Sequence, residues 1–170
     1  MKNWAKLMLA AAGAALLLAG CAGPRYADVA AKIPPLEPQN GRLYFYQLAS
    51  AAGEAAAEPA IMVDGRKVGR SKPARFFFLD RPAGTVSLAL AERTSQSGAL
   101  SVPLSVPLSV PLSVPLSVPL AAGQTRYVRV EIENGRQVLR QEASEEVALQ
   151  SMADLKYWGA GWRDREKLRY

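Results

Sequence analysis

The chain of 170 residues carries a formal net charge of +6, and 49% of its residues are hydrophobic. This length and composition indicate one folded domain with additions, and so small a charge without a nucleic-acid-binding motif argues against nucleic acid as a partner. The sequence has no histidine and one cysteine, which excludes Ser-His and Cys-His nucleophile pairs and His/Cys metal sites, so we assign no catalytic residue, cofactor or metal site.

Residues 1–20 have the pattern of a secretory signal peptide. Lys2 and Lys6 form a basic start, residues 7–18 form an Ala/Leu-rich apolar core, and small residues follow. The apolar core is shorter than the ~20 residues that a permanent membrane-spanning helix needs. We therefore expect residues 1–20 to be removed from the mature protein.

The residues that follow, Leu18-Ala19-Gly20-Cys21, resemble the lipobox of bacterial lipoproteins. The resemblance implies that Cys21 is acylated, becomes the mature N-terminus and anchors the protein to a membrane. Cys21 has no disulfide partner within the chain, and an intermolecular disulfide is the weaker alternative. Because Ala22 stands where an aspartate would signal retention at the inner membrane, the resemblance implies the periplasmic face of the outer membrane of a Gram-negative bacterium.

Residues 21–40 are predicted to form a lipidated, proline-rich tether. Four prolines, at positions 24, 34, 35 and 38, favour an extended chain, with at most one helical turn at residues 27–32. Such a tether would hold the domain away from the lipid surface.

Residues 41–158 are predicted to form a mainly β, small antiparallel β-sandwich-like domain with one C-terminal helix. The first strand is expected at residues 43–48. Its aromatic run, Tyr44-Phe45-Tyr46, is either core or a platform that stacks on sugars, and we favour core. Residues 49–59 are expected to form a loop.

A β-hairpin and two strands are predicted next. The apolar residues 61–63 and Val68 flank Asp64-Gly65, a pair that readily adopts the positive φ angles of a tight turn. Residues 76–79 form an apolar run, and residues 86–90 alternate at period two as a half-buried strand does.

Five cations occur within ten residues after the hairpin turn. One interpretation is a solvated turn, which we favour. The other is a surface for anionic lipid headgroups, cell-wall carboxylates or an acidic partner. The residues are Arg66, Lys67, Arg70, Lys72 and Arg75.

Residues 101–120 are five tandem copies of Ser-Val-Pro-Leu. A proline every fourth residue excludes a helix. In an extended chain every Val and Leu points to one side, and the prolines remove N–H donors from one edge only, as an edge strand allows. The copies are either a functional stalk or recognition segment, or the expansion of one ancestral copy, which we favour.

Residues 125–132 alternate as a strand, with Tyr127, or instead Val128, Val130 and Ile132, facing the core. Asn134-Gly135 then predicts a hairpin that returns through residues 137–140.

A helix is predicted over residues 144–158, capped by Ser144 and packed across the sheet through an apolar stripe. Residues 159–170 form a basic tail, interpreted as a frayed terminus or as a contact with a membrane surface. The members of the stripe are Ala148, Met152 and Leu155.

Four segments resemble the landmarks of a bacterial lipoprotein family known as a domain of unknown function, the 2846 family, with PEGA-type β-domains as the second resemblance. They begin at residues 41 (Gly-Arg-Leu-Tyr-Phe-Tyr), 63 (Val-Asp-Gly-Arg-Lys-Val-Gly), 81 (Arg-Pro-Ala-Gly-Thr-Val) and 122 (Ala-Gly-Gln-Thr-Arg-Tyr-Val-Arg-Val). The resemblance implies a β-domain over about residues 41–157 and supplies no catalytic positions.

The sequence thus predicts a lipid-anchored periplasmic envelope protein that acts as a binding or scaffolding module and not as an enzyme. Its expected partners are the membrane, through the anchor, and an envelope protein or peptidoglycan. The first alternative is a peptidoglycan- or glycan-binding module. The more remote one is a hydrolase that uses a carboxylate pair from Asp64, Asp80 or Glu92.

Overall fold

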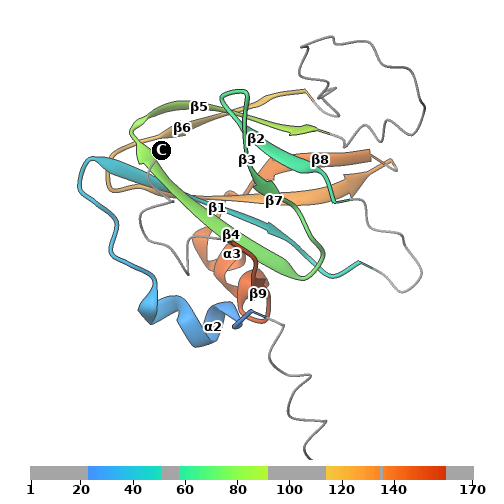
Figure 1. Cartoon of the computed structure of the whole chain (residues 1–170), viewed down its shortest axis with the longest axis horizontal. Helices are drawn as coiled ribbons and strands as arrows, with labels where there is room; N and C mark the ends of the chain where they lie inside the picture. Colours follow the sequence, from blue (N-terminus) through green and yellow to red (C-terminus); the bar gives the residue numbers. More distant parts are fainter. Residues whose placement is uncertain (1–22, 51–57, 92–113, 135, 160–170) are drawn as a thin grey trace, which may run out of the picture.

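The computed structural model describes residues 23–50, 58–91, 114–134 and 136–159. In these residues the chain forms two β-sheets that face each other, with the helices against the outer side of the larger sheet (Figure 1). The prediction of a mainly β, sandwich-like domain with one C-terminal helix is confirmed. Residues 1–20, Cys21 and residues 160–170 lie outside the described residues, so the expectations for them stay predictions.

The larger sheet has five strands in the order β8-β7-β1-β4-β9. At its centre β1 (Asn40–Gln47) runs antiparallel to β4 (Arg75–Pro82) and parallel to β7 (Thr125–Glu133). The edges are β8 (Arg136–Gln141) and the short β9 (Lys156–Tyr157), which is parallel to β4. The prediction of an antiparallel domain is therefore wrong for this sheet, because long connections return β7 and β9 in the direction of their neighbours.

The smaller sheet is antiparallel throughout, in the order β3-β2-β5-β6. The predicted hairpin joins β2 (Ala60–Val63) to β3 (Arg66–Arg70), and its turn residues Asp64 and Gly65 have φ angles of 48° and 75°. These positive angles are those of the turn that suits the twist of a two-residue hairpin. The remaining strands are β5 (Gly84–Ala91), which shows the predicted alternation, and β6 (Leu116–Leu120).

Both faces of the larger sheet are covered. Phe45 and Phe77 stack with their ring centroids 5.1 Å apart on the side of the smaller sheet, where Phe77 lies against Gly69. Tyr44 points the other way and meets the ring of Tyr26 edge-on at 5.9 Å. The aromatic run in β1 is thus core, as favoured above, and the alternative of a sugar-stacking platform is wrong for it.

The strand β7 buries side chains on both of its faces near its middle. Tyr127, Val128 and Val130 are buried, but Ile132 is 48% exposed. Its prediction as a core residue is wrong because β7 runs past the end of β1, whose last partner is Val130. Asn134, at φ 50°, then turns the chain back into β8, which confirms the second hairpin.

The helix α3 (Glu145–Met152) begins where predicted and ends earlier. The Ser144 hydroxyl accepts a hydrogen bond from the Val147 N–H, and Met152 is fully buried. The helix lies beneath the larger sheet (Figure 1). The predicted end near residue 158 is wrong because Lys156 and Tyr157 are extended and pair with β4. The strand pairing provides hydrogen-bond partners for backbone N–H and C=O groups that would otherwise bond within a longer helix.

The segment before β1 packs on the larger sheet instead of extending from it. It forms α2 (Tyr26–Val29) and the 3-10 helix η2 (Ala30–Lys32), so the helical segment lies where one turn was expected and is longer than that turn. Val29 is only 3% exposed, and the Tyr26 N–H donates to the carbonyl of Leu155 at 2.9 Å. The prediction of an extended tether is therefore wrong for this segment. No helix in the described parts of the chain is long and apolar enough to cross a membrane.

The fifth Ser-Val-Pro-Leu copy forms most of β6. Val118 and Leu120 are buried, Ser117 and Pro119 are exposed, and Pro119 lies opposite Thr85 of β5. The strand β6 is the edge of its sheet, as its proline pattern predicts. Residues 101–113, which hold the first three copies and the first residue of the fourth, lie outside the described residues.

Candidate functional site

The structure separates the five clustered cations into two groups. Arg66 and Lys67 are exposed at the hairpin turn, and the other three lie at the opposite end of β3, where the chain crosses to β4. In this second group the Arg70 guanidinium donates to the carbonyl of Glu58 at 3.3 Å, and the Lys72 ammonium lies 3.2 Å from the Glu58 carboxylate. The cationic stretch therefore contributes to two surfaces at opposite ends of a strand.

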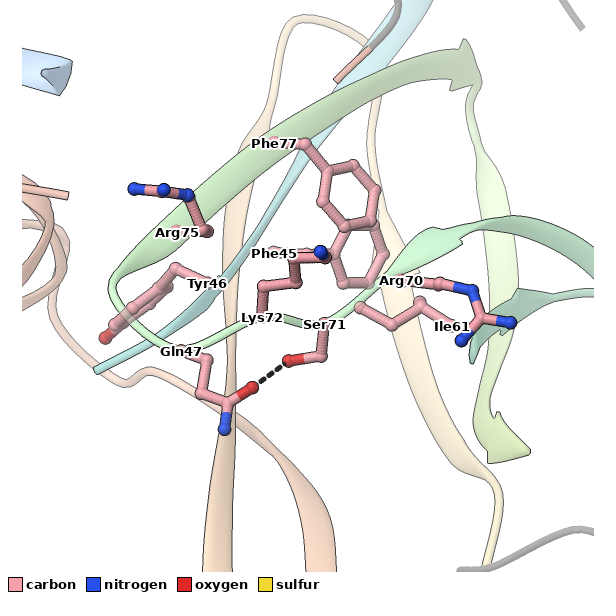
Figure 2. Close-up of a pocket in the computed structure, with 9 residues that line it drawn as sticks. All are labelled: Phe45, Tyr46, Gln47, Ile61, Arg70, Ser71, Lys72, Arg75 and Phe77. Atoms are coloured by element: carbon pink, nitrogen blue, oxygen red, sulfur yellow. Dashed lines mark hydrogen bonds between the residues drawn. The ribbon is translucent and has the colours of Figure 1, made fainter. Parts of the chain in front are cut away.

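The second group surrounds a hollow of about 10 Å³, which has room for about one water molecule. Figure 2 shows Ser71 and Gln47 facing each other in the hollow, while the guanidinium groups of Arg70 and Arg75 extend away from it on opposite sides. The Ser71 hydroxyl donates to the Gln47 side-chain carbonyl at 2.5 Å, and both residues are buried. A hollow of this size is too small to hold a cofactor, and its charged rim faces outward.

A partly exposed aromatic and cationic surface adjoins the hollow. Arg75 and Lys156 are register partners in β4 and β9, and Trp158 follows Lys156 on the same face. The Lys72 ammonium lies 4.1 Å from the centre of the Trp158 ring, and Trp158 is 44% exposed. We call Lys72, Arg75, Lys156 and Trp158 the β9 surface.

The N-terminal segment leads directly to the β9 surface. Arg25 bridges Lys156 in antiparallel fashion, and the Tyr157 N–H donates to the carbonyl of Pro24 at 2.8 Å. The same register places Gly23 beside Trp158, and a Cβ on Gly23 would lie 2.2 Å from the carbonyl oxygen of Tyr157. Cys21 is two residues earlier, so the chain between Cys21 and this point spans at most ~7 Å.

Arg25 adds little free charge to this end of the molecule. Its guanidinium lies 3.1 Å from the carboxylate of Asp28 and 3.5 Å from that of Asp154. Glu58 likewise offsets the charge of Lys72. Within the described parts of the chain Arg75 and Lys156 have no ion-pair partner, so they carry the positive charge of the β9 surface, and Trp158 provides its exposed apolar area.

The carboxylates considered for catalysis have structural roles. Asp64 accepts a hydrogen bond from the Ser87 N–H at 2.9 Å and pairs with Arg81 at 2.5 Å. The Ser87 hydrogen bond, with the charge of Arg81, lowers the pKa of Asp64. Asp80 is held by Arg42 through two hydrogen bonds of 2.6 Å, and Glu92 lies outside the described residues. In the described part of the chain no three His, Cys, Asp or Glu residues gather as metal ligands would.

A half-buried polar network lies under the larger sheet and was not predicted from the sequence. The Tyr46 hydroxyl donates to Glu142 at 2.8 Å, and Arg129 pairs with the same carboxylate at 3.2 Å. The Tyr127 hydroxyl donates to Glu145 in the first turn of α3, again at 2.8 Å. Burial raises the pKa of both tyrosines, and the neighbouring carboxylates raise it further. The network joins α3 and its leading loop to the sheet.

These features define a small two-sheet β-domain with an outward-facing cationic and aromatic surface. Residues 37–143 match the model of a family described as "Protein of unknown function (DUF2846)". Because the match covers more than half of the chain, the protein belongs to the DUF2846 family, as the resemblance implied. The PEGA-type resemblance is not shown. A search of curated proteins and a search of solved structures each gave no match.

The family match ends before α3, so the expected extent to about residue 157 is too long. The N-terminal helix α2, α3 and β9 all lie outside the match, although α2 and α3 lie against one face of the larger sheet and β9 is its edge strand. The β9 surface is therefore built partly from elements beyond the matched region.

Proposed function

We propose that this protein is a lipid-anchored envelope protein, acylated at Cys21 and held at the periplasmic face of the outer membrane, where its domain serves as a binding or scaffolding module. The observation that carries the proposal is the packing of residues 23–25 along β9. It brings the chain, two residues after the lipobox cysteine, to an exposed tryptophan flanked by cations. Tryptophan and basic residues are the side chains that favour the interface between membrane and water.

This attachment gives the domain an orientation on the membrane. With the anchor beside the β9 surface, that surface lies near the lipid headgroups, and the β2–β3 turn lies at the far end of the domain (Figure 1). The exposed Arg66 and Lys67 of that turn then face the periplasm, where carboxylates of the cell wall or of an acidic protein can reach them. Asp64, paired with Arg81, and Asp80, paired with Arg42, have no catalytic role in this proposal.

A glycan-binding module is the second candidate function. The observation that favours it is the exposed Trp158 indole, because an aromatic face can stack on a sugar ring. Lys72 already covers the Trp158 ring, which leaves less of it for a sugar. Retention of the protein by purified peptidoglycan, lost in Trp158→Ala, would support this second candidate.

Cys21→Ser is expected to abolish incorporation of labelled palmitate in cells, because a hydroxyl is a far poorer nucleophile than a thiolate for lipid transfer. The variant should leave the membrane fraction or stay there with an uncleaved signal peptide. Ala22→Ser is the matched control, since it changes the next residue and keeps the thiol. Label that persists in Cys21→Ser would show that the protein is not acylated at this cysteine.

A further inference from the structure

The edge strand position beside β5 is occupied by β6, which packs its apolar side chains into the core. Val118 and Leu120 of β6 are 0% and 2% exposed, and Val118 lies opposite Val86. Leu120 fills a space that exists because residue 41 of the facing sheet is glycine, where a Cβ would lie 2.3 Å from the Leu120 side chain. Ser117 and Pro119 face outward. The contact with β5 therefore requires only a Val and a Leu two residues apart on an extended chain.

The sequence supplies this strand five times. Because a leucine precedes each copy, the stretch Leu-Ser-Val-Pro-Leu occurs identically from residues 100, 104, 108, 112 and 116. A shift by one copy is a shift by four residues, an even number, so it preserves which side chains face inward and which backbone positions lack an N–H. The β5 edge therefore has no contact with which to distinguish one copy from another.

What selects the fifth copy within one molecule is its covalent connection. The turn after Leu120 is held by a hydrogen bond from the Ala121 N–H to the Gln124 side chain at 2.9 Å, and Gly123 has a φ angle of 72°. The Gly123 N–H donates to the carbonyl of Asn40 at 2.8 Å, which fixes the turn to β1. This tight link favours the adjacent copy and acts only within one chain.

We propose that the β5 edge, with Val86, Leu88 and Gly41, is a binding site for an extended Leu-Ser-Val-Pro-Leu strand, and that a second copy of this chain supplies that strand. An identical element exchanged between protomers is the general route of domain swapping, and an extended segment added to a sheet edge is a common mode of recognition. In the intact chain the fifth copy occupies the site, so another chain enters only when β6 leaves.

The test uses three forms of the non-acylated chain 22–170, which contains every residue that the structure describes. The acceptor lacks residues 101–120 and so has an empty β5 edge. The first donor is the complete chain, which has four copies beyond the one in β6. The matched control donor lacks residues 101–116 and has only the copy that fills its own β6.

Labelled acceptor is mixed with each donor and followed by size-exclusion chromatography with light scattering. We expect a complex with the complete chain and none with the single-copy donor. If the acceptor does not fold alone, the readout is the gain of strand signal in circular dichroism when a peptide of two Ser-Val-Pro-Leu copies is added. A control peptide of the same composition has the order Ser-Pro-Val-Leu, which places proline instead of valine at the inward-facing position. It should give no gain.

Equal binding by the two donors would place the contact outside the repeat and overturn the proposal. The acceptor could also bind neither donor, or gain no strand signal with either peptide. Either result would show that the β5 edge does not bind a strand from another chain. Equal rescue by both peptides would also overturn the proposal, because the β5 edge would then not distinguish the order of Val, Pro and Leu.

Discussion

Asp80→Ala is expected to lower the free energy of unfolding by about 3 kcal/mol, because the change leaves the charge of Arg42 buried without its partner. The Arg42 side chain is 8% exposed and that of Asp80 is 23% exposed. Burial alone would disfavour the guanidinium charge, but the hydrogen bonds and charge of Asp80 more than offset it and raise the pKa of Arg42. Arg42 keeps a hydrogen bond to the carbonyl of Pro34, which limits the loss.

Urea unfolding of the chain 22–170 measures this effect, and two variants control it. Asp154→Ala removes a partner of the exposed Arg25 and should leave stability nearly unchanged. Arg42→Met combined with Asp80→Leu removes both charges and should recover much of the loss, because an apolar pair leaves no buried charge. A loss below about 1 kcal/mol in Asp80→Ala would show that solvent already screens this pair.

Removal of all five Ser-Val-Pro-Leu copies, residues 101–120, is expected to cost about 3–6 kcal/mol, since full burial of a Val or Leu side chain contributes ~1.5–3 kcal/mol. The buried Val118 and Leu120 are both lost. Stability of a whole domain is only ~5–15 kcal/mol, so this variant is expected to be partly or fully unfolded.

Removal of four copies is the matched control and should leave the fold intact. The product has the same sequence whichever four copies are removed, and Leu100 then stands where Leu116 stood before the remaining copy. Shortening the connection between β5 and β6 should stabilise the domain by ~0.6 kcal/mol for each halving of its length. Light scattering should fall, because fewer Val/Leu edges remain for pairing. A loss above about 2 kcal/mol would mean that the repeat is part of the core.

Local signals in the sequence predicted the turns and the alternating strands well, for a physical reason. Asp64-Gly65 carries its own turn preference, and the period-two pattern of β5 follows from one buried face. The edge position of β6 followed from proline chemistry in the same way. In each case the residues that decide the structure are neighbours in the chain.

The missed features depend on residues far apart in the chain. The parallel pairing of β1 with β7 and the short β9 are set by the path of long connections, which no local pattern contains. The end of α3 was missed because Lys156 and Tyr157 pair with β4 rather than continue the helix. Arg42 gave no sign in the sequence that it is buried, since only Asp80 across the sheet makes its burial tolerable.

The sequence predicts an anchor at Cys21 but gives no sign of the surface to which the N-terminal segment leads. The prolines of residues 21–40 drew attention to an extended tether, although the apolar Tyr26 and Val29, three residues apart, are spaced to face one side of a helical turn. The β9 surface depends on the pairing of Arg25 with Lys156, so it could not be predicted from either segment alone.

The most direct test of a domain anchored with its β9 surface at the bilayer is site-specific photo-crosslinking in intact cells. A benzophenone amino acid replaces Trp158 in one variant and the exposed Lys67 of the far hairpin turn in the other. The lipid-anchored orientation requires phospholipid adducts at position 158 and few or none at position 67. Glycan or protein adducts without phospholipid at position 158, or equal phospholipid adducts at both positions, would contradict it.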